Sequence, residues 1–224
     1  MPTLNLNKGG NVVGTVDTSQ AAARDEAVGT ATNTGTATGV QYFASPGRGG
    51  GTYRYIRTFL QFDSSGITGT VSAAVLNIAG AGTTNNADII VCASDAFGGT
   101  NANLVVADFN NVDFSTAYSS ELATWNNNGN NAITLNAAAR SIIQSGNSFI
   151  CAVIDHDSDF QDTDTQSGGA GSHTVSINFG GTITLDCTLA ATGYTHTVMG
   201  VAPANIEKVI GVATADIEKI IGVD

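Results

Sequence analysis

The stretch that decides the fold reads Tyr53-Arg54-Tyr55-Ile56-Arg57-Thr58-Phe59-Leu60-Gln61-Phe62. Aromatic or aliphatic side chains alternate along it with polar ones at a period of two, which is the pattern of a β-strand. Gly51 precedes the stretch and the turn sequence Asp63-Ser64-Ser65-Gly66 follows it, so both of its ends are marked. We therefore predict a strand here. Because arginines and aromatics alternate on it, we expect the arginines to lie on a solvated face of a sheet.

Further strands are predicted on both sides of this stretch. They cover residues 11–16, 40–43, 71–79, 87–93, 148–155, 173–179 and 182–189. In residues 71–79 the core candidates are Val71, Ala73, Val75 and Ile78. The last two strands are joined by Gly180-Gly181, and a two-residue link of this kind predicts a tight hairpin.

One internal helix is predicted over residues 137–144. Asn136 can cap its N-terminus, and Gly146 can end it. Many short strands with a single helix favour an all-β fold over a parallel α/β fold, which needs a helix between successive strands. We expect an antiparallel, jelly-roll-like β-sandwich with one short helix, plus a short repeat tail.

The composition changes along the chain and suggests three segments. Residues 1–51 are rich in Gly and Thr, have little to bury, and are interpreted as an N-terminal strand and loop excursion of the sandwich. Residues 52–192 form the sandwich core, and residues 193–224 form the tail.

Charge and cysteine content restrict the function classes. Eight Lys+Arg against 19 Asp+Glu give a net charge of −11, which repels phosphate backbones, so no nucleic-acid partner is expected. No run of residues approaches the roughly 18 apolar residues that a membrane span requires, so no membrane partner is expected either. Cys92, Cys151 and Cys187 each lie in an apolar run and are interpreted as buried, unpaired residues of a protein made in a reducing cytoplasm.

The C-terminus contains a tandem repeat with a period of eleven residues. Residues 200–210 read Gly-Val-Ala-Pro-Ala-Asn-Ile-Glu-Lys-Val-Ile, and residues 211–221 read Gly-Val-Ala-Thr-Ala-Asp-Ile-Glu-Lys-Ile-Ile. One interpretation is a continuous helical stripe. We prefer a broken repeat, because the recurrent Gly and Pro203 oppose a continuous helix. In it Asn205 or Asp216 caps about one helical turn, Ile-Glu-Lys-Ile/Val-Ile, and the next Gly closes this turn before a short extended step. A unit this small cannot bury its own apolar side chains, so we expect it to contact another copy or another protein. The expected contact residues are Ile206, Val209, Ile210, Ile217, Ile220 and Ile221.

The densest acidic stretch spans residues 155–164. Asp155, Asp157 and Asp159 are spaced like the start of a calcium loop, but the sixth position is Phe160 rather than Gly and the twelfth is Gln166 rather than Glu. A solvated acidic loop is therefore the preferred interpretation. No motif for nucleophilic or metal-dependent catalysis occurs, so we predict no catalytic residue, no cofactor and no metal, and a protein that is not an enzyme.

Two parts of the sequence resemble known proteins. The units Ile206–Val212 and Ile217–Val223 resemble short repeats that recur in bacteriophage virion proteins. Separately, Arg57–Ile67 followed by Val71–Ile78 is similar to the opening of the DNRLRE-type β-sandwich domains of cell-surface and phage proteins. These resemblances imply a non-catalytic sandwich in a virion structural protein.

The resemblance leads to two hypotheses of function. The first is a structural component of the phage particle, located in the virion after assembly in the host cytoplasm, with copies of itself (a trimer favoured) and other virion proteins as partners. It would be a capsid decoration, head-fibre, neck or tail protein. The alternative is a carbohydrate-binding or receptor-binding module of a phage fibre, in which Trp125, with Tyr53 and Tyr55 as further candidates, stacks on a host surface glycan.

Overall fold

The computed structural model describes residues 1–35, 37–45, 51–82, 85, 88–99, 102–163, 171–190, 208–209 and 212–213. Contacts along the chain divide it into two compact units, Met1–Thr188 (the body) and Leu189–Asp224 (the tail unit). This division lies close to the predicted start of the tail at residue 193. Among the described residues, no helix is long and apolar enough to cross a membrane.

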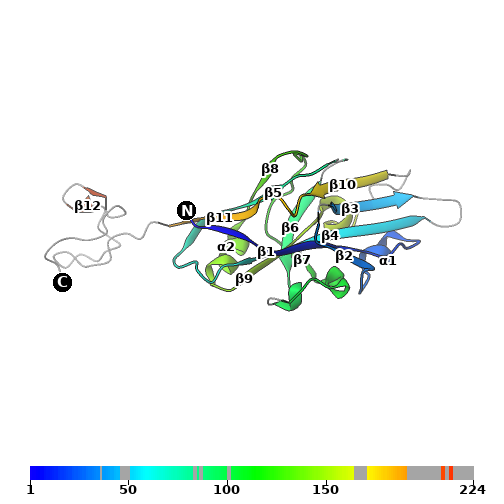
Figure 1. The fold of residues 1–224 in the computed structure, drawn as a ribbon, viewed down its shortest axis with the longest axis horizontal. Coiled ribbons are helices and arrows are strands. Elements are labelled where there is room, and N and C mark those ends of the chain that lie inside the picture. Colours follow the sequence, from blue (N-terminus) through cyan, green and yellow to red (C-terminus); the bar gives the residue numbers. More distant parts are fainter. Residues whose placement is uncertain are drawn as a thin grey trace. The chain divides into compact units, whose positions relative to one another are not determined.

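The body is all-β, as predicted (Figure 1). Its strands are β1 (Thr3–Val13), β2 (Ala31–Asn33), β3 (Ala37–Ser45), β4 (Thr52–Asp63), β5 (Val71–Ala79), β6 (Ile89–Ser94), β7 (Val112–Ala117), β8 (Asn130–Thr134), β9 (Ser148–Asp155), β10 (Gly171–Ile177) and β11 (Ile183–Leu189). Its helical elements are α1 (Gln20–Arg24), α2 (Ala137–Gln144), the 3-10 turns η1 (Phe97–Gly99) and η2 (Val106–Asn110), and the π-turn η3 (His156–Phe160). The predicted strands at residues 53–62, 71–79 and 148–155 are therefore confirmed.

Strand β1 takes part in both layers of the body. Its first residues pair with β11, where Thr3 lies opposite Asp186. From Leu6 onward it pairs with β4, with a register shift between Leu6 and Lys8. One layer runs β1-β11-β5-β8, and the other runs β7-β6-β9-β4-β1. The edge of β4 that faces away from β1 pairs first with β3 and then with β9, while β3 also pairs with β10. The antiparallel sheet thus curls into a sandwich-like body.

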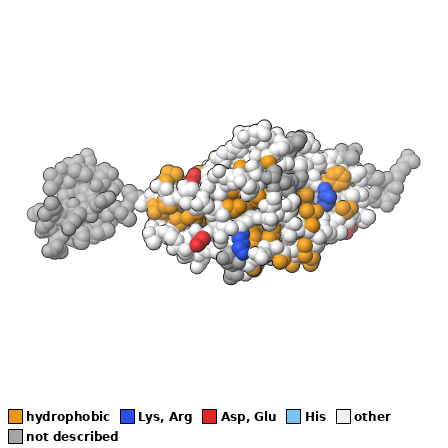
Figure 2. Space-filling model, in the orientation of Figure 1, with side chains coloured by type: hydrophobic (Ala, Val, Ile, Leu, Met, Phe, Trp, Pro, Cys, Tyr) orange, Lys and Arg blue, Asp and Glu red, His pale blue; other side chains and the backbone are white. Residues whose placement is uncertain are grey.

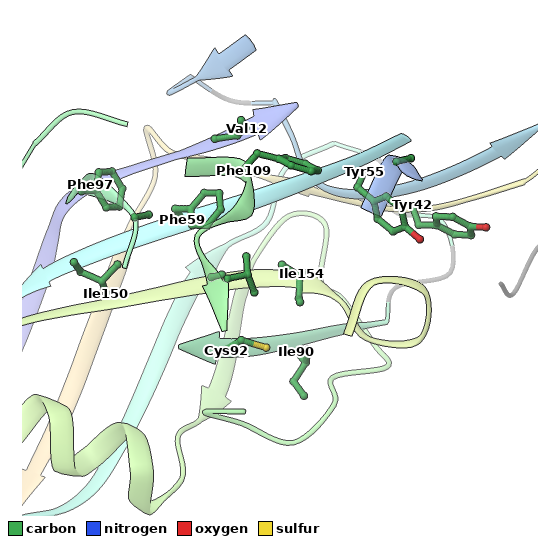
Figure 3. Close-up of a cluster of buried hydrophobic side chains, with 14 of the residues drawn as sticks. Val12, Tyr42, Tyr55, Phe59, Ile90, Cys92, Phe97, Phe109, Ile150 and Ile154 are labelled. Atoms are coloured by element: carbon green, nitrogen blue, oxygen red, sulfur yellow. The ribbon is translucent and has the colours of Figure 1, made fainter. Parts of the chain in front are cut away.

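Both faces of β4 are covered, which corrects the expectation of a solvated face. Tyr55 and Phe59 belong to a cluster of buried side chains that also receives Phe97 from η1 and Phe109 from η2 (Figure 3). On the opposite face of β4, Leu60 and Phe62 are buried as well. Because η1, η2 and α1 fold over the outer face of the strand, Arg57 on that face has no solvent exposure at all.

The predicted helix is confirmed as α2. The Asn136 side chain accepts hydrogen bonds from the backbone N–H groups of Ala138 and Ala139, which have no partner inside the helix. Gly146 follows with φ +73°, a left-handed conformation that ends a helix at little cost for glycine. A second helix, α1, is an addition to the prediction: Ser19 caps it, and Ala23 anchors it in the core.

Several predicted strand details are wrong. The first strand begins at Thr3 rather than residue 11 and ends at Val13, because Leu4 and Leu6 already alternate with polar residues. β10 and β11 do not form a hairpin, because β10 pairs with β3 and β11 pairs with β1. Of the core residues predicted in β5, Val71 and Ile78 are buried and Val75 is half-buried, but Ala73 is exposed. Leu76, which was not predicted, is fully buried.

The prediction that the three cysteines are buried and unpaired is confirmed. Cys92, Cys151 and Cys187 are free and buried. Burial raises the pKa of the Cys92 thiol to about 12, so this thiol stays protonated at neutral pH and is a poor nucleophile.

In the tail unit the described residues form one short antiparallel pair, β12 (Lys208–Val209) with β13 (Val212–Ala213). The extended Val212–Ala213 agrees with the predicted extended step of the repeat. Lys208 and Val209 differ from both helical interpretations, because they form a strand. These two residues pair with Val212 and Ala213, so their backbone hydrogen bonds are made between strands rather than within a helix.

Candidate functional site

The structure places the predicted site residues in different surroundings. Trp125 lies in the loop between β7 and β8 and is partly exposed. Its Nε1 atom is buried without a hydrogen-bond partner among the described residues, next to the backbone of Gly80, where an added Cβ would lie 3.0 Å from Nε1. Tyr55 is fully buried and Tyr53 packs against the core, so Tyr55 is not available as a surface for a sugar ring.

Of the predicted contact residues in the repeats, only Val209 is described, and it lies in β12. Ile206, Ile210, Ile217, Ile220 and Ile221 lie outside the described residues. Their role as a docking surface stays a prediction.

The acidic stretch after β9 forms the turn η3, and its three spaced aspartates contact three different sets of partners. Asp155 accepts a hydrogen bond from the Ser158 backbone N–H at 2.7 Å and contacts His173 Nδ1 at 2.9 Å. Asp157 contacts His156 Nδ1 at 2.9 Å, and Asp159 pairs with Arg57. The three carboxylates therefore do not converge as a calcium loop requires. The preferred interpretation is also wrong for Asp155 and Asp159, which are buried rather than solvated.

A buried ion pair fixes this turn to the middle of β4. The Arg57 guanidinium donates hydrogen bonds to both carboxylate oxygens of Asp159, from Nε to Oδ2 at 2.7 Å and from Nη2 to Oδ1 at 2.6 Å. It also donates to the backbone oxygens of Phe109 at 2.8 Å and Arg24 at 2.7 Å. Its Cζ atom lies 4.2 Å from the centre of the Phe109 ring. This two-point geometry is the one in which an arginine binds a carboxylate most strongly.

The carboxylate of this pair is subject to two opposing effects. Burial raises the pKa of Asp159, and the charge and hydrogen bonds of Arg57 act against this rise by stabilising the ionised form.

Helix α1 and β4 hold the same turn through backbone oxygens. Tyr55 Oη donates to the Ser158 oxygen at 2.9 Å, and Gln20 Nε2 donates to it at 3.2 Å. Arg24 Nε donates to the Asp159 oxygen at 2.6 Å. The turn is therefore held at several points, and the side chains that project from it are presented in fixed positions.

Next to this turn lies a group of ionisable side chains, which we name the histidine–carboxylate cluster. Its members are Asp88, Glu121, Asp155, His156, Asp157 and His173. They come from the start of β6, the loop after β7, the end of β9 with η3, and β10. The backbone bridge from His156 N–H to the Asp88 oxygen, at 2.9 Å, sets these segments side by side.

His156 occupies the centre of one half of the cluster. Its Nδ1 atom lies 2.9 Å from Asp157 Oδ1, 3.5 Å from Asp88 Oδ1 and 3.7 Å from Glu121 Oε2. In the other half, the side chain of His173 contacts the buried Asp155. Arrangements of imidazole and carboxylate groups can exchange protons near neutral pH or bind a cation.

Two pKa values in the cluster are shifted by identifiable causes. Burial, followed by the negative charges of Asp155 and Asp157, raises the pKa of Asp88 to about 7. The hydrogen bond with Asp155 raises the pKa of His173, against the opposing effect of burial.

The sequence prediction missed this cluster. It considered the acidic stretch by itself, whereas Asp88 and Glu121 come from distant segments that only the pairing of β6 with β9 and the bridge between Ile89 and Leu122 bring to His156. No local spacing indicates such a site. The comparisons with known proteins add no assignment, because no protein-family model matches the chain and no curated protein matches its sequence.

Proposed function

We propose that this chain is a non-enzymatic structural component of a bacteriophage particle, one that self-associates and docks through its C-terminal repeats. A capsid decoration, head-fibre, neck or tail protein would each fit. The observation that carries the proposal is the eleven-residue repeat, which lies in a compact unit of its own, Leu189–Asp224.

Burial energetics support a docking role for the repeats. The two successive copies place all six predicted contact residues, each an isoleucine or valine, between Ile206 and Ile221. Apolar surface gains about 25 cal/mol for each Å² removed from water, so a partner surface that covers these side chains would gain several kcal/mol before the costs of association. Copies of this chain and other virion proteins are the partners that the proposal names, in the virion after assembly in the host cytoplasm.

The body fits a structural rather than a catalytic role. Its most buried ionisable pair, Arg57 with Asp159, is fully used in internal bonds that fix a turn. The face of the body in Figure 2 carries few charged side chains, with hydrophobic side chains scattered among other side chains and backbone. Such a surface suits a protein that is packed among neighbours in a particle.

The test uses the full chain and two double variants of the same chemistry. Ile210→Asp with Ile221→Asp places charges in the repeats, and Val16→Asp with Val28→Asp places them on exposed valines of the body. We expect the wild type and the body variant to sediment as a trimer and to be present in purified particles by mass spectrometry. The repeat variant should sediment as a 22.7 kDa monomer and be absent from particles. Normal incorporation of the repeat variant would show that the repeats are not the anchor, and its unfolding would show that they belong to the core of the body.

The alternative function is a carbohydrate-binding or receptor-binding module of a phage fibre. The observation in its favour is the partly exposed indole of Trp125 in an asparagine-rich loop, because aromatic faces and amide groups are the groups that contact sugars.

A further inference from the structure

The strongest unassigned feature of the body is the half of the histidine–carboxylate cluster around His156. Asp88, His156 and Asp157 each offer one ligand atom, and these atoms lie within 4.8 Å of one another. The three residues come from two segments, and the hydrogen bond between the His156 N–H and the Asp88 oxygen holds these segments together.

The distances match the edges of a small coordination shell. Ligand atoms about 2.0–2.1 Å from a tetrahedral metal ion lie about 3.3 Å from one another. From His156 Nδ1, the distances to the oxygens of Asp157, Asp88 and Glu121 are 2.9, 3.5 and 3.7 Å. Asp88, His156 and Asp157 thus offer three ligand atoms within 4.8 Å of one another. The more exposed Glu121 lies close enough to the nitrogen to supply a fourth.

One oxygen of this group lies near an imidazole but accepts no hydrogen bond from the described residues. Asp88 Oδ1 is buried and has no hydrogen-bond partner among the described residues, and the side chain that carries it is only 14% exposed. A buried carboxylate oxygen without a donor is costly. The ion pairs described for Asp88, Glu121 and Asp157 involve His156 alone, so one imidazole faces three acidic groups. A bound cation would supply both the missing contact and the missing charge.

We propose that Asp88, His156 and Asp157, completed by Glu121, bind one divalent metal ion of the zinc class. The nitrogen ligand decides the class, because imidazole suits zinc and its transition-metal neighbours, whereas calcium and magnesium favour shells of oxygen alone. The ion links the start of β6, the loop after β7 and the turn η3. It therefore acts as a structural clamp at this place in the body, and this role is independent of the proposed function of the repeats.

The experiment uses the full chain without an affinity tag, dialysed against EDTA and then freed of it. Zinc chloride is titrated by calorimetry, and thermal unfolding is followed with and without zinc. We expect one zinc ion per chain and a higher Tm in its presence. Cobalt(II) should give the visible absorption bands of a tetrahedral site with nitrogen and oxygen ligands.

Two variants and a control decide the assignment. Asp88→Asn and His156→Gln should each weaken zinc binding at least tenfold, and either one suffices if the other fails to fold. Asp95→Asn removes the same charge from an exposed position and should leave zinc binding unchanged. The proposal is overturned if zinc shows no saturable binding, if both variants bind like the wild type, or if calcium binds with zinc's expected affinity while zinc does not.

Discussion

Replacing Asp159 with asparagine tests how the body is held together at its centre. The change keeps the size of the side chain but removes the negative charge opposite Arg57. The guanidinium would still donate to the oxygens of Phe109 and Arg24, but its two bonds to the carboxylate, at 2.6 and 2.7 Å, would be lost or weakened. Because Arg57 has no solvent exposure, water cannot replace the lost partner.

The expected loss of stability is large. Removing one partner of a buried ion pair typically costs about 3–5 kcal/mol, since the other charge stays buried. In a folded unit of this size, each kcal/mol lowers the Tm by roughly 2–4 °C, so Asp159→Asn should lower it by about 6–20 °C. Urea unfolding followed by circular dichroism and by Trp125 fluorescence would measure the free energy directly, and coincident transitions would justify a two-state analysis.

Two further variants make this result specific. Removing both charges with Arg57→Met and Asp159→Leu should cost less than Asp159→Asn alone, because no unpaired charge is then buried. Asp95→Asn, on the surface, should change the free energy of unfolding by no more than about 0.5 kcal/mol. A loss below about 1 kcal/mol for Asp159→Asn would refute the reasoning, because Arg57 would then have to reach water or another acceptor.

Two other predictions concern single side chains of the body. The raised pKa of His173 means that its protonated form stabilises the folded state. This stabilisation is fully present below about pH 6.5, the pKa of an unfolded histidine, and it is lost as the pH rises through the higher pKa of the folded state. His173→Gln should therefore destabilise the chain clearly at pH 5.5 and little at pH 9 in urea unfolding, and an equal loss at both values would contradict the role of the charge. If the chain binds a glycan through Trp125, the wild type should bind defined sugars on a glycan array and Trp125→Ala should lose that binding with its Tm largely kept; silence of the wild type would count against this alternative.

Local patterns predicted the elements whose causes are local. The prediction placed β4 correctly from its alternation and its flanking turn residues, and it placed α2 correctly from Asn136 and Gly146. Alternation, helix capping and the left-handed conformation of a glycine each depend on only a few neighbouring residues. The burial of Arg57 could not be predicted in this way. Its partner Asp159 is 102 residues away, and the segments that cover β4 carry no signal of where they will fold.

The same limit explains the errors at β10 and the missed cluster. Gly180-Gly181 has the composition of a hairpin turn, but β10 finds its partner in β3, more than a hundred residues earlier. Asp88 and His156 meet only because β6 pairs with β9. Choices between partners that are distant in sequence depend on the whole sheet, which a window of a few residues does not contain.

The shared strand β1 has a consequence for how the chain folds during its synthesis. Thr3 Oγ1 donates to Asp186 across 183 residues of sequence, and the Cys187 N–H donates to the oxygen of Pro2. β1 is synthesised long before β11, so the first residues of β1 have no pairing partner until the last strand of the body is made. Contacts of such long range make folding slow, and until they form, the open edge of β1 can pair with other chains. The final step of folding should therefore follow release of the body from the ribosome, and the nascent chain should be most prone to aggregation just before β11 emerges.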